Sequence, residues 1–242
     1  MGNLDNQTAV NRCLQKGTTL LEYGMDKLGY LPPFNPYNAT CSREEYCTNS
    51  SLHRGIYHPS PIIDLLIGNT KRGSLKKQFP HNHQFTHRYM YNDGILMCIE
   101  TYFQSKVAYT EYLYYDQKQR YGVTIDNEMR LAAVTEEIFD ADHIVAFSLM
   151  NCVLLGGKYK CIDLRSENYY YDSEGLVECD MQKLSPMGMT VINEHYIWER
   201  EAGYLTAYTN ISCLHEHRKY PVKKRRSAQI SLEMMRMPQL SD

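Results

Sequence analysis

Three histidines within one seven-residue stretch, His81, His83 and His87, are the residues of this sequence best suited to chemistry. Imidazole nitrogens are common ligands of Zn²⁺, and a histidine can also act as a base toward water. Four upstream residues could add ligands to such a site: Cys41, Cys47, His53 and His58. Five residues separate the two cysteines, whereas zinc knuckles usually space paired cysteines by about two to four residues, so that one tight turn presents both sulfurs. We therefore interpret the cysteines as loop residues and the histidines as facing solvent, and keep a zinc site at the three histidines as the alternative.

The same histidines could serve a metal-dependent hydrolase or nuclease, in which one histidine activates water and the others hold the metal. No carboxylate-rich segment follows them at helical spacing. A separate acidic group could bind a cation or divide acid and base roles between carboxylates: Glu136, Glu137, Asp140, Asp142 and His143. Strand ends and turns collect Asp and Glu in any case. Because Gly-x-Ser-x-Gly, P-loop and Gly-x-Gly-x-x-Gly motifs are all absent, we favour a protein without catalytic residues.

The composition limits the partners of the chain. Its 242 residues carry 26 basic and 28 acidic side chains, a net charge of -2, so no overall field attracts nucleic acid. No stretch approaches the ~18 continuous apolar residues of a membrane span, and the first residues lack the basic and then apolar layout of a secretory signal. We therefore expect a cytoplasmic protein with reduced cysteines, no membrane span and no bound cofactor.

Two helices are expected in the first 80 residues. Apolar residues recur at gaps near three and four over residues 6–28, which predicts one amphipathic helix, either continuous or broken where Gly17 and Gly24 interrupt the run. The apolar run over 60–68, with Ser60 as its N-cap, predicts a short second helix. The residues between these two helices are expected to form an irregular loop.

The period of apolar residues changes from helical to two after residue 80, which is typical of strands. Turn residues punctuate the chain at short intervals, as at Asn92-Asp93-Gly94 and Gly156-Gly157. About nine strands are expected between Phe85 and His217 with no helical interval, which leaves no room for the crossovers that parallel strands need. The sequence therefore predicts an α+β fold, mainly β, in which N-terminal helices precede a large antiparallel meander.

This pattern divides the chain into three expected segments. They are a helical segment that packs on the sheet (1–80), an antiparallel β-meander domain (81–218) and a basic tail or terminal helix (219–242). An open sheet, a barrel and a sandwich would all use the same alternation of apolar and polar residues.

A tyrosine-rich segment, 169–176, reads Tyr-Tyr-Tyr-Asp-Ser-Glu-Gly-Leu and resembles the Tyr-x-Tyr-Asp-x-x-Gly-x-Leu unit of the tyrosine-aspartate (RHS-type) repeats. Residues 89–96 resemble a shortened unit, and the resemblance implies a strand, a tight turn and a second strand. The spacing from Tyr91 to Tyr115 to Tyr171 follows no fixed period. The chain is also similar to the small, Tyr-rich immunity proteins that neutralise bacterial toxins, which implies a bacterial protein that binds another protein.

Tyrosine occurs 21 times, against one tryptophan and six phenylalanines. Tyrosine suits half-exposed sheet faces, because its ring packs while its hydroxyl stays in water, and it makes rigid contacts with partner proteins. We expect a non-catalytic protein-binding module with these contact residues: Tyr112, Tyr114, Tyr169, Tyr171 and Trp198. Two alternatives stand beside it. One is a hydrolase or nuclease at His81, His83 and His87, and the other is a β-sheet carrier that encloses an apolar molecule.

Overall fold

This computed structural model describes residues 2–31, 41–60, 63, 72–80, 84–141, 143–173, 175–184, 190–201, 204–212 and 217–221. Within these ranges the long helix α1 (Gly2–Leu28) and the 3₁₀ turn η1 (Gly55–Tyr57) accompany thirteen strands. The strands are β1 (Arg43–Thr48), β2 (Ser74–Lys76), β3 (Phe85–Asn92), β4 (Ile95–Phe103), β5 (Lys106–Asp116), β6 (Gln119–Asp126), β7 (Leu131–Asp140), β8 (His143–Leu155), β9 (Lys158–Asp172), β10 (Gly175–Leu184), β11 (Val191–Glu201), β12 (Tyr204–Ser212) and β13 (His217–Pro221).

All of these strands belong to one sheet, in the order β13-β12-β11-β10-β9-β8-β7-β6-β5-β4-β3-β1-β2. From β3 onward each strand pairs antiparallel with its neighbours in the chain, so the expected meander with a helix at the N-terminus is confirmed. The turns behave as their residues predict. Asp93 and Gly94 both have positive φ, 48° and 81°, as do Gly156 and Gly157, and two-residue hairpin turns require this conformation.

The prediction of nine strands was too low. The loop that was expected to be irregular contains β1, which pairs with both β2 and β3. The β1 sequence, Arg-Glu-Glu-Tyr-Cys-Thr, starts with three charged residues and lacks the alternation by which strands are recognised. Its strand conformation is imposed by its place between two neighbours, and sequence periodicity does not report such tertiary pairing.

The helix α1 runs without a break through Gly17 and Gly24, so the single amphipathic helix is confirmed in its continuous form. A Cβ on Gly24 would lie 2.5 Å from Cγ2 of Val134, and one on Gly17 would lie 3.3 Å from Sγ of Cys161. Both glycines therefore face the sheet and let the helix approach it closely. They fall in the same stripe as the buried residues Val10, Cys13 and Leu20, and this contact outweighs the weak helix propensity of glycine.

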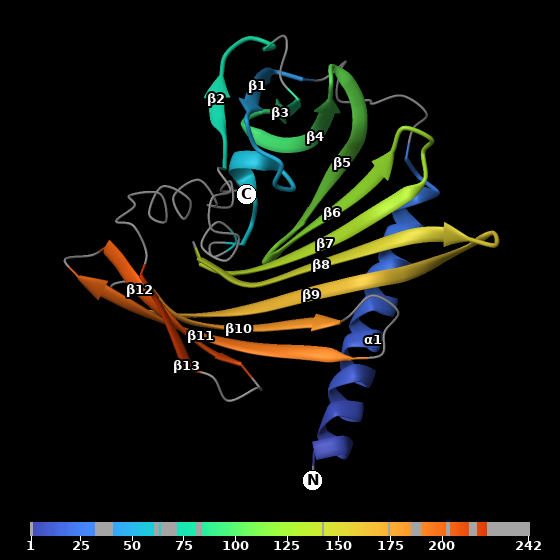
Figure 1. Cartoon of the computed structure of the whole chain (residues 1–242). Helices are drawn as coiled ribbons and strands as arrows, with labels where there is room; N and C mark the ends of the chain where they lie inside the picture. The colour runs from blue at the N-terminus through green and yellow to red at the C-terminus, as the bar shows by residue number, and fades with distance from the viewer. Residues whose placement is uncertain are drawn as a thin grey trace.

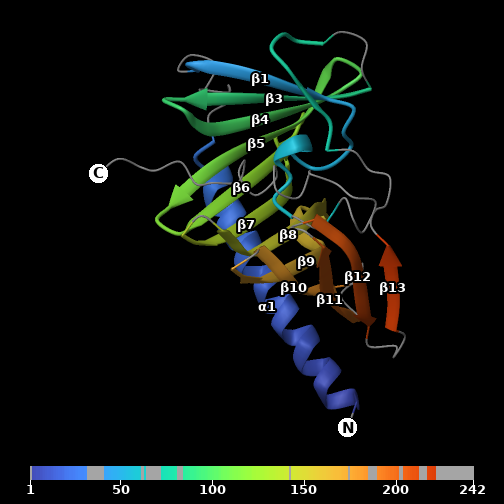
Figure 2. The same ribbon diagram turned by 90° about the vertical axis from the view of Figure 1, so that its left-hand side faces the viewer.

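The sheet is strongly curved, so that one of its faces is convex and the other is concave (Figure 1). The helix α1 covers the convex face of the central strands, whereas η1 and the chain around it lie in the concave side (Figure 2). The convex core gathers apolar residues of α1 and of β6 to β11, among them Leu20, Val134 and Met150. A second core on the concave side is aromatic and includes Phe147, Tyr169 and Trp198.

Two expected segments lie partly outside the described residues. Of the second helix, Ser60 and Ile63 are described. Ile63 is helical, and the Ser60 hydroxyl donates a 2.7 Å hydrogen bond to Glu167 of β9. Of the basic tail, residues 219–221 belong to β13, and residues 222–242 lie outside the described part of the chain.

Candidate ligand site in the concave face

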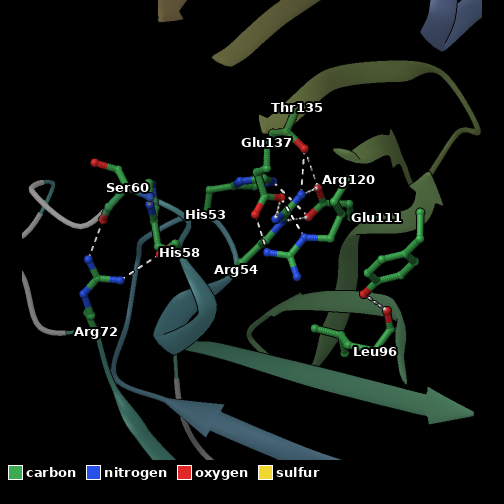
Figure 3. A network of polar contacts seen from close by, with 11 residues as sticks. His53, Arg54, His58, Ser60, Arg72, Leu96, Glu111, Arg120, Thr135 and Glu137 are labelled. Atoms are coloured by element: carbon green, nitrogen blue, oxygen red, sulfur yellow. Dashed lines mark hydrogen bonds and ion pairs between the residues drawn. The ribbon is translucent and has the colours of Figure 1, made fainter. Parts of the chain in front are cut away.

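A buried ion network joins the loop before η1 to the middle of the sheet (Figure 3). Arg54 inserts its guanidinium between strands, where only 1% of its side chain is exposed. Its Nε and Nη2 donate to the two carboxylate oxygens of Glu111 over 2.8 and 2.6 Å, and its Nη1 donates to Glu137 over 2.5 Å. Arg120 donates to the same Glu137 carboxylate from a second side, over 2.9 Å from its Nε. Two positive and two negative charges therefore balance inside the concave wall.

The network depends on a glycine in β6 and on strained backbone in the loop. A Cβ on Gly122 would lie 1.9 Å from Oε1 of Glu111 and 2.5 Å from Nη2 of Arg54, so only glycine leaves room for both groups. Arg54 itself has a φ of 61°, a left-handed conformation that non-glycine residues rarely adopt. Such strain persists where the surrounding contacts over-determine the conformation, and the four hydrogen bonds from the Arg54 guanidinium supply those contacts.

The network also fixes the charge of its carboxylates. Burial alone would raise the pKa of Glu111, but the positive charge of Arg54 outweighs burial and holds that pKa well below its usual range. The pKa of Glu137 is lowered in the same way, by Arg120 and Arg54 together. Both carboxylates are therefore ionised at neutral pH, and each is engaged by a guanidinium.

A cavity of about 490 Å³ opens beside this network on the concave side. It is lined by the loop residues Ser51, Leu52 and His53 and by residues of seven strands: Phe85, His87, Thr101, Tyr109, Glu111, Thr124, Ala132, Ala133, Asn151, Cys152, Ile162 and Asp163. Apolar walls with a few converging polar groups, within a volume of roughly 300–1,000 Å³, are the usual features of small-molecule sites.

One cross-strand row forms part of the cavity wall. Its members lie directly opposite one another on consecutive strands from β5 to β9, in the order Glu111, Thr124, Ala133, Asn151 and Asp163. Adjacent strands lie about 4.8 Å apart, so the two terminal residues are separated by roughly 19 Å along the sheet. A carboxylate therefore lies at each end of a row whose middle residue is small.

Three polar atoms at this cavity have no hydrogen-bond partner within the described chain: Nδ1 and Nε2 of His53 and Oγ1 of Thr124, all shielded from bulk water. Nε2 of His53 does lie 3.1 Å from Oε2 of Glu111, close enough for an ion pair, which leaves Nδ1 and the Thr124 hydroxyl without a partner. Buried polar atoms usually have a hydrogen-bond partner, because an unpaired one costs about 1–3 kcal/mol. These two atoms therefore mark where a ligand could form hydrogen bonds.

His87, the one described member of the predicted histidine group, does not face solvent, so that interpretation was wrong for this residue. It is buried in β3, and both ring nitrogens have partners. Nε2 lies 3.2 Å from the Ser50 carbonyl, which can only accept, so Nε2 carries the proton and Nδ1 accepts from the Thr101 hydroxyl at 3.1 Å. Burial lowers the pKa of His87 to about 4.

The proposed zinc ligands are not brought together as far as the chain is described. His81 and His83 lie outside the described residues. Among the residues that are described, no group of three or more His, Cys, Asp and Glu side chains is arranged to hold a metal ion. The hydrolase hypothesis, which requires His81 and His83, stays a prediction.

The five aromatic residues expected to contact a partner lie in or against the cores. Tyr112, Tyr169 and Trp198 are buried. Tyr114 lies edge-on to Tyr23 of α1 with ring centroids 6.4 Å apart, and the Tyr171 hydroxyl donates to the Ile144 carbonyl over 2.8 Å. These rings hold the helix and the strands together, because their large apolar area is best buried where several elements meet.

Sequence reasoning considered His53 only as an additional zinc ligand, and it missed the other residues that define the site: Arg54, Glu111, Gly122 and Asp163. One signal was available. In β5, Glu111 has the same inward alternation as the buried Leu113. A carboxylate at such a position requires a buried positive partner. The sequence separation of 57 residues hides which cation that is.

An exposed row of two apolar residues and one carboxylate lies on the convex face of the sheet, outside the area that α1 covers. Tyr170, Glu178 and Ile197 lie directly opposite one another on β9, β10 and β11. Tyr170 is 47% exposed and Ile197 is 37% exposed, and the Tyr170 hydroxyl donates to Asp180 over 2.8 Å. We call Tyr170, Glu178, Ile197 and Asp180 together the convex patch. It combines apolar area with two carboxylates that His195 contacts, at 2.7 Å from Asp180 and 3.7 Å from Glu178, and such amphipathic area suits a protein partner.

A comparison with protein-family models and with curated protein sequences found no match to this chain. None of the helices in the described part of the chain combines the length and the apolar composition that crossing a bilayer requires. The architecture is thus an open, curved antiparallel meander with a helix on one face and a ligand-sized cavity in the other, and its function has to be argued from that cavity and from the exposed surface.

Proposed function

We propose that this chain is a non-catalytic binding protein that holds a small, partly apolar molecule in the cavity of its concave face. The cavity itself is the observation that carries this proposal: its volume of about 490 Å³ is that of a small-molecule site, and unpaired polar atoms lie in its wall. The function resembles the sheet-enclosed carrier expected as an alternative from the sequence, with a more polar ligand.

The rigidity of the wall supports binding, because a preformed site loses little entropy when it is occupied. Arg54 ties the loop that carries His53 to β5 and β7 through charged hydrogen bonds. The titratable groups support binding more than catalysis. Glu111 is engaged by a guanidinium on both oxygens, and both nitrogens of His87 are occupied, so neither group is free to take a proton from a substrate.

Two tyrosines of almost equal exposure provide the test. Tyr109 lines the cavity and is 46% exposed, whereas Tyr170 lies on the convex face and is 47% exposed. The full-length protein, purified gently from its source cell, is denatured and its small-molecule content is measured by mass spectrometry. We expect a co-purifying molecule that Tyr109→Ala reduces severalfold and Tyr170→Ala leaves unchanged. Equal losses in both variants would count against the cavity as the site.

Protein binding is the second candidate, and the convex patch favours it. An exposed tyrosine and isoleucine beside two carboxylates offer the amphipathic contact that partner proteins use. An immunity-type role and a cytoplasmic location stay predictions under this candidate. Affinity capture from the source cell with Ile197→Lys should lose the partner, whereas Ile192→Lys, at an exposed position on the opposite side of β11, should retain it. Capture of the same proteins by both variants would exclude the patch as the contact.

A further inference from the structure

The residues that line the cavity carry more negative than positive charge. Two carboxylates, Glu111 and Asp163, line the cavity, and none of the described lining residues is a lysine or an arginine. His87 adds no charge near neutral pH, because its ring is buried and its pKa is lowered to about 4. The wall therefore offers negative charge and hydrogen-bond acceptors to whatever enters.

The two carboxylates differ in how many of their oxygens already accept a hydrogen bond. Both oxygens of Glu111 already accept hydrogen bonds from Arg54. Asp163 accepts one hydrogen bond through Oδ1, from Nδ2 of Asn151 over 2.8 Å, and no ion pair to Asp163 occurs among the residues that the structure describes. Asp163 is thus the half-buried, uncompensated negative charge of the cavity, and such a charge favours a positive partner.

The row offers further acceptors, one beside Asp163 and one nearer to Glu111. Asn151 uses its amide hydrogens toward Asp163, which leaves its carbonyl oxygen as an acceptor. Thr124, which lies next to Glu111 at the other end of the row and is only 5% exposed, has a hydroxyl with no hydrogen-bond partner among the described residues. A protonated primary amine has three hydrogens in a compact group and no acceptor, so it matches a wall of acceptors better than a carboxylate or a phosphate does.

We infer that the cavity binds a small organic amine, whose ammonium group pairs with Asp163 and whose apolar body lies against Leu52, Phe85 and Ile162. This inference rests on the proposed function and names the chemical class of its ligand. Tyr109 at the exposed edge of the cavity adds an aromatic face, to which cations are attracted.

Ligands with one body and three different head groups test this inference. Phenethylamine, 2-phenylethanol and phenylacetate share a phenyl body, and hexylamine, hexanol and hexanoate share an aliphatic one. Binding of each to the full-length protein is followed by NMR chemical-shift titration at pH 7.5 and low salt. We expect the amine of each set to bind about tenfold more tightly than the alcohol, and the acid to bind most weakly.

Asp163→Asn removes the charge and keeps the shape and the Asn151 contact. It should weaken amine binding about tenfold and leave alcohol binding unchanged. The matched control is Asp140→Asn, which removes an exposed carboxylate at the end of β7, outside the cavity lining, and it should bind all six compounds as the parent protein does. Folding of both variants is checked by their unfolding midpoints.

The outcomes separate the two proposals. If alcohols or acids bind as tightly as amines, or if Asp163→Asn retains amine affinity, the amine inference is overturned and the binding function stands. If none of the six compounds shifts the resonances of cavity residues at millimolar concentration, both the binding function and the amine inference are overturned.

Discussion

Arg54 fills the space above Gly122: a Cβ on this glycine would lie 2.5 Å from Nη2 of the arginine. The two residues belong to a loop and to the central strand β6, and the absence of one side chain makes room for the other. Because the same Cβ would lie 1.9 Å from Oε1 of Glu111, a glycine at this position leaves room for both members of a buried ion pair. The loop that carries His53 is thus held to the cavity wall through this contact.

Gly122→Ala should therefore destabilise the fold by about 3 kcal/mol, because the added methyl group forces buried charges apart. Urea unfolding at pH 7.5 measures the change. Gly29→Ala is the control, since its Cβ would meet only the Asp26 carbonyl at an ordinary 3.5 Å. We expect that variant to remain within about 0.5 kcal/mol of the parent protein. Equal stability of the two variants would contradict this account of Gly122.

Glu137→Gln tests whether the balance of charges in the buried ion network stabilises the fold, whereas Gly122→Ala tests the steric fit of that network. The Glu137 carboxylate is fully buried and pairs with both Arg54 and Arg120. Its neutral isostere would leave two buried guanidiniums beside a single carboxylate, which should cost about 3–5 kcal/mol of unfolding free energy. Glu128→Gln, at a side chain that is 64% exposed and paired with Arg130, should leave the unfolding midpoint unchanged. A similar small effect in both variants would mean that the buried network contributes little.

The meander could be predicted from the sequence because its signals are local. Alternating residues and turns such as Asn92-Asp93-Gly94 specify a hairpin within about ten residues. The strand β1 could not be predicted, since its pairing with β3 joins residues more than 40 positions apart. Whether α1 continues through Gly17 and Gly24 could not be decided from the sequence either, because the effect of glycine on helix propensity is local whereas the contact of these glycines with the sheet is not.

The candidate site could be predicted even less. Each of its charged residues is unremarkable in its own segment, and Arg54 comes together with Glu111 and Glu137 only when the sheet curves around the loop. The tyrosine count was interpreted as a binding surface, whereas Tyr112 and Tyr169 are buried. A tyrosine satisfies a core and a surface equally well, so its frequency alone does not separate the two.

Stability should fall between pH 6.5 and 4 because of His87. Burial lowers its pKa in the folded state to about 4, from 6.5. Within this window the unfolded chain binds a proton that the folded chain does not, so stability is present above pH 6.5 and is lost as the pH falls, by up to ~1.4 kcal/mol per pH unit. His87→Gln removes this titration, and urea unfolding at pH 7.5, 6.5, 5.5 and 4.5 should give it a shallower pH dependence than the parent protein.

The remaining pH dependence of His87→Gln should come from other groups. Burial also lowers the pKa of His58, which acts in the same direction. The carboxylates Glu111 and Glu137, whose pKa values are held below their usual range, lose their contribution only as the pH falls below about 4.3, the value for an unfolded glutamate. Parallel curves for the parent protein and His87→Gln between pH 6.5 and 4.5 would show that His87 is not the titrating group.

The rate at which each cysteine thiol is alkylated should show how often the fold opens around it. All seven that the structure describes are free thiols. Burial raises the pKa of Cys152 to about 12 and that of Cys161 to about 11, so at pH 8 only about one Cys152 in ten thousand is a thiolate. Because the thiolate is the form that reacts, iodoacetamide should modify the partly exposed Cys41 long before Cys152.

Peptide mass spectrometry over a time course measures this order. Denaturant should abolish the difference, because unfolding removes the burial that raises the Cys152 pKa. The Cys152 side chain packs in the convex core, on the far side of the wall from the cavity, so an amine that fills the cavity should slow its modification only by stabilising the sheet, and should leave Cys41 unaffected. Equal rates for the two cysteines in the native protein would mean that the wall around Cys152 opens faster than the reagent reacts, which contradicts a rigid, preformed cavity.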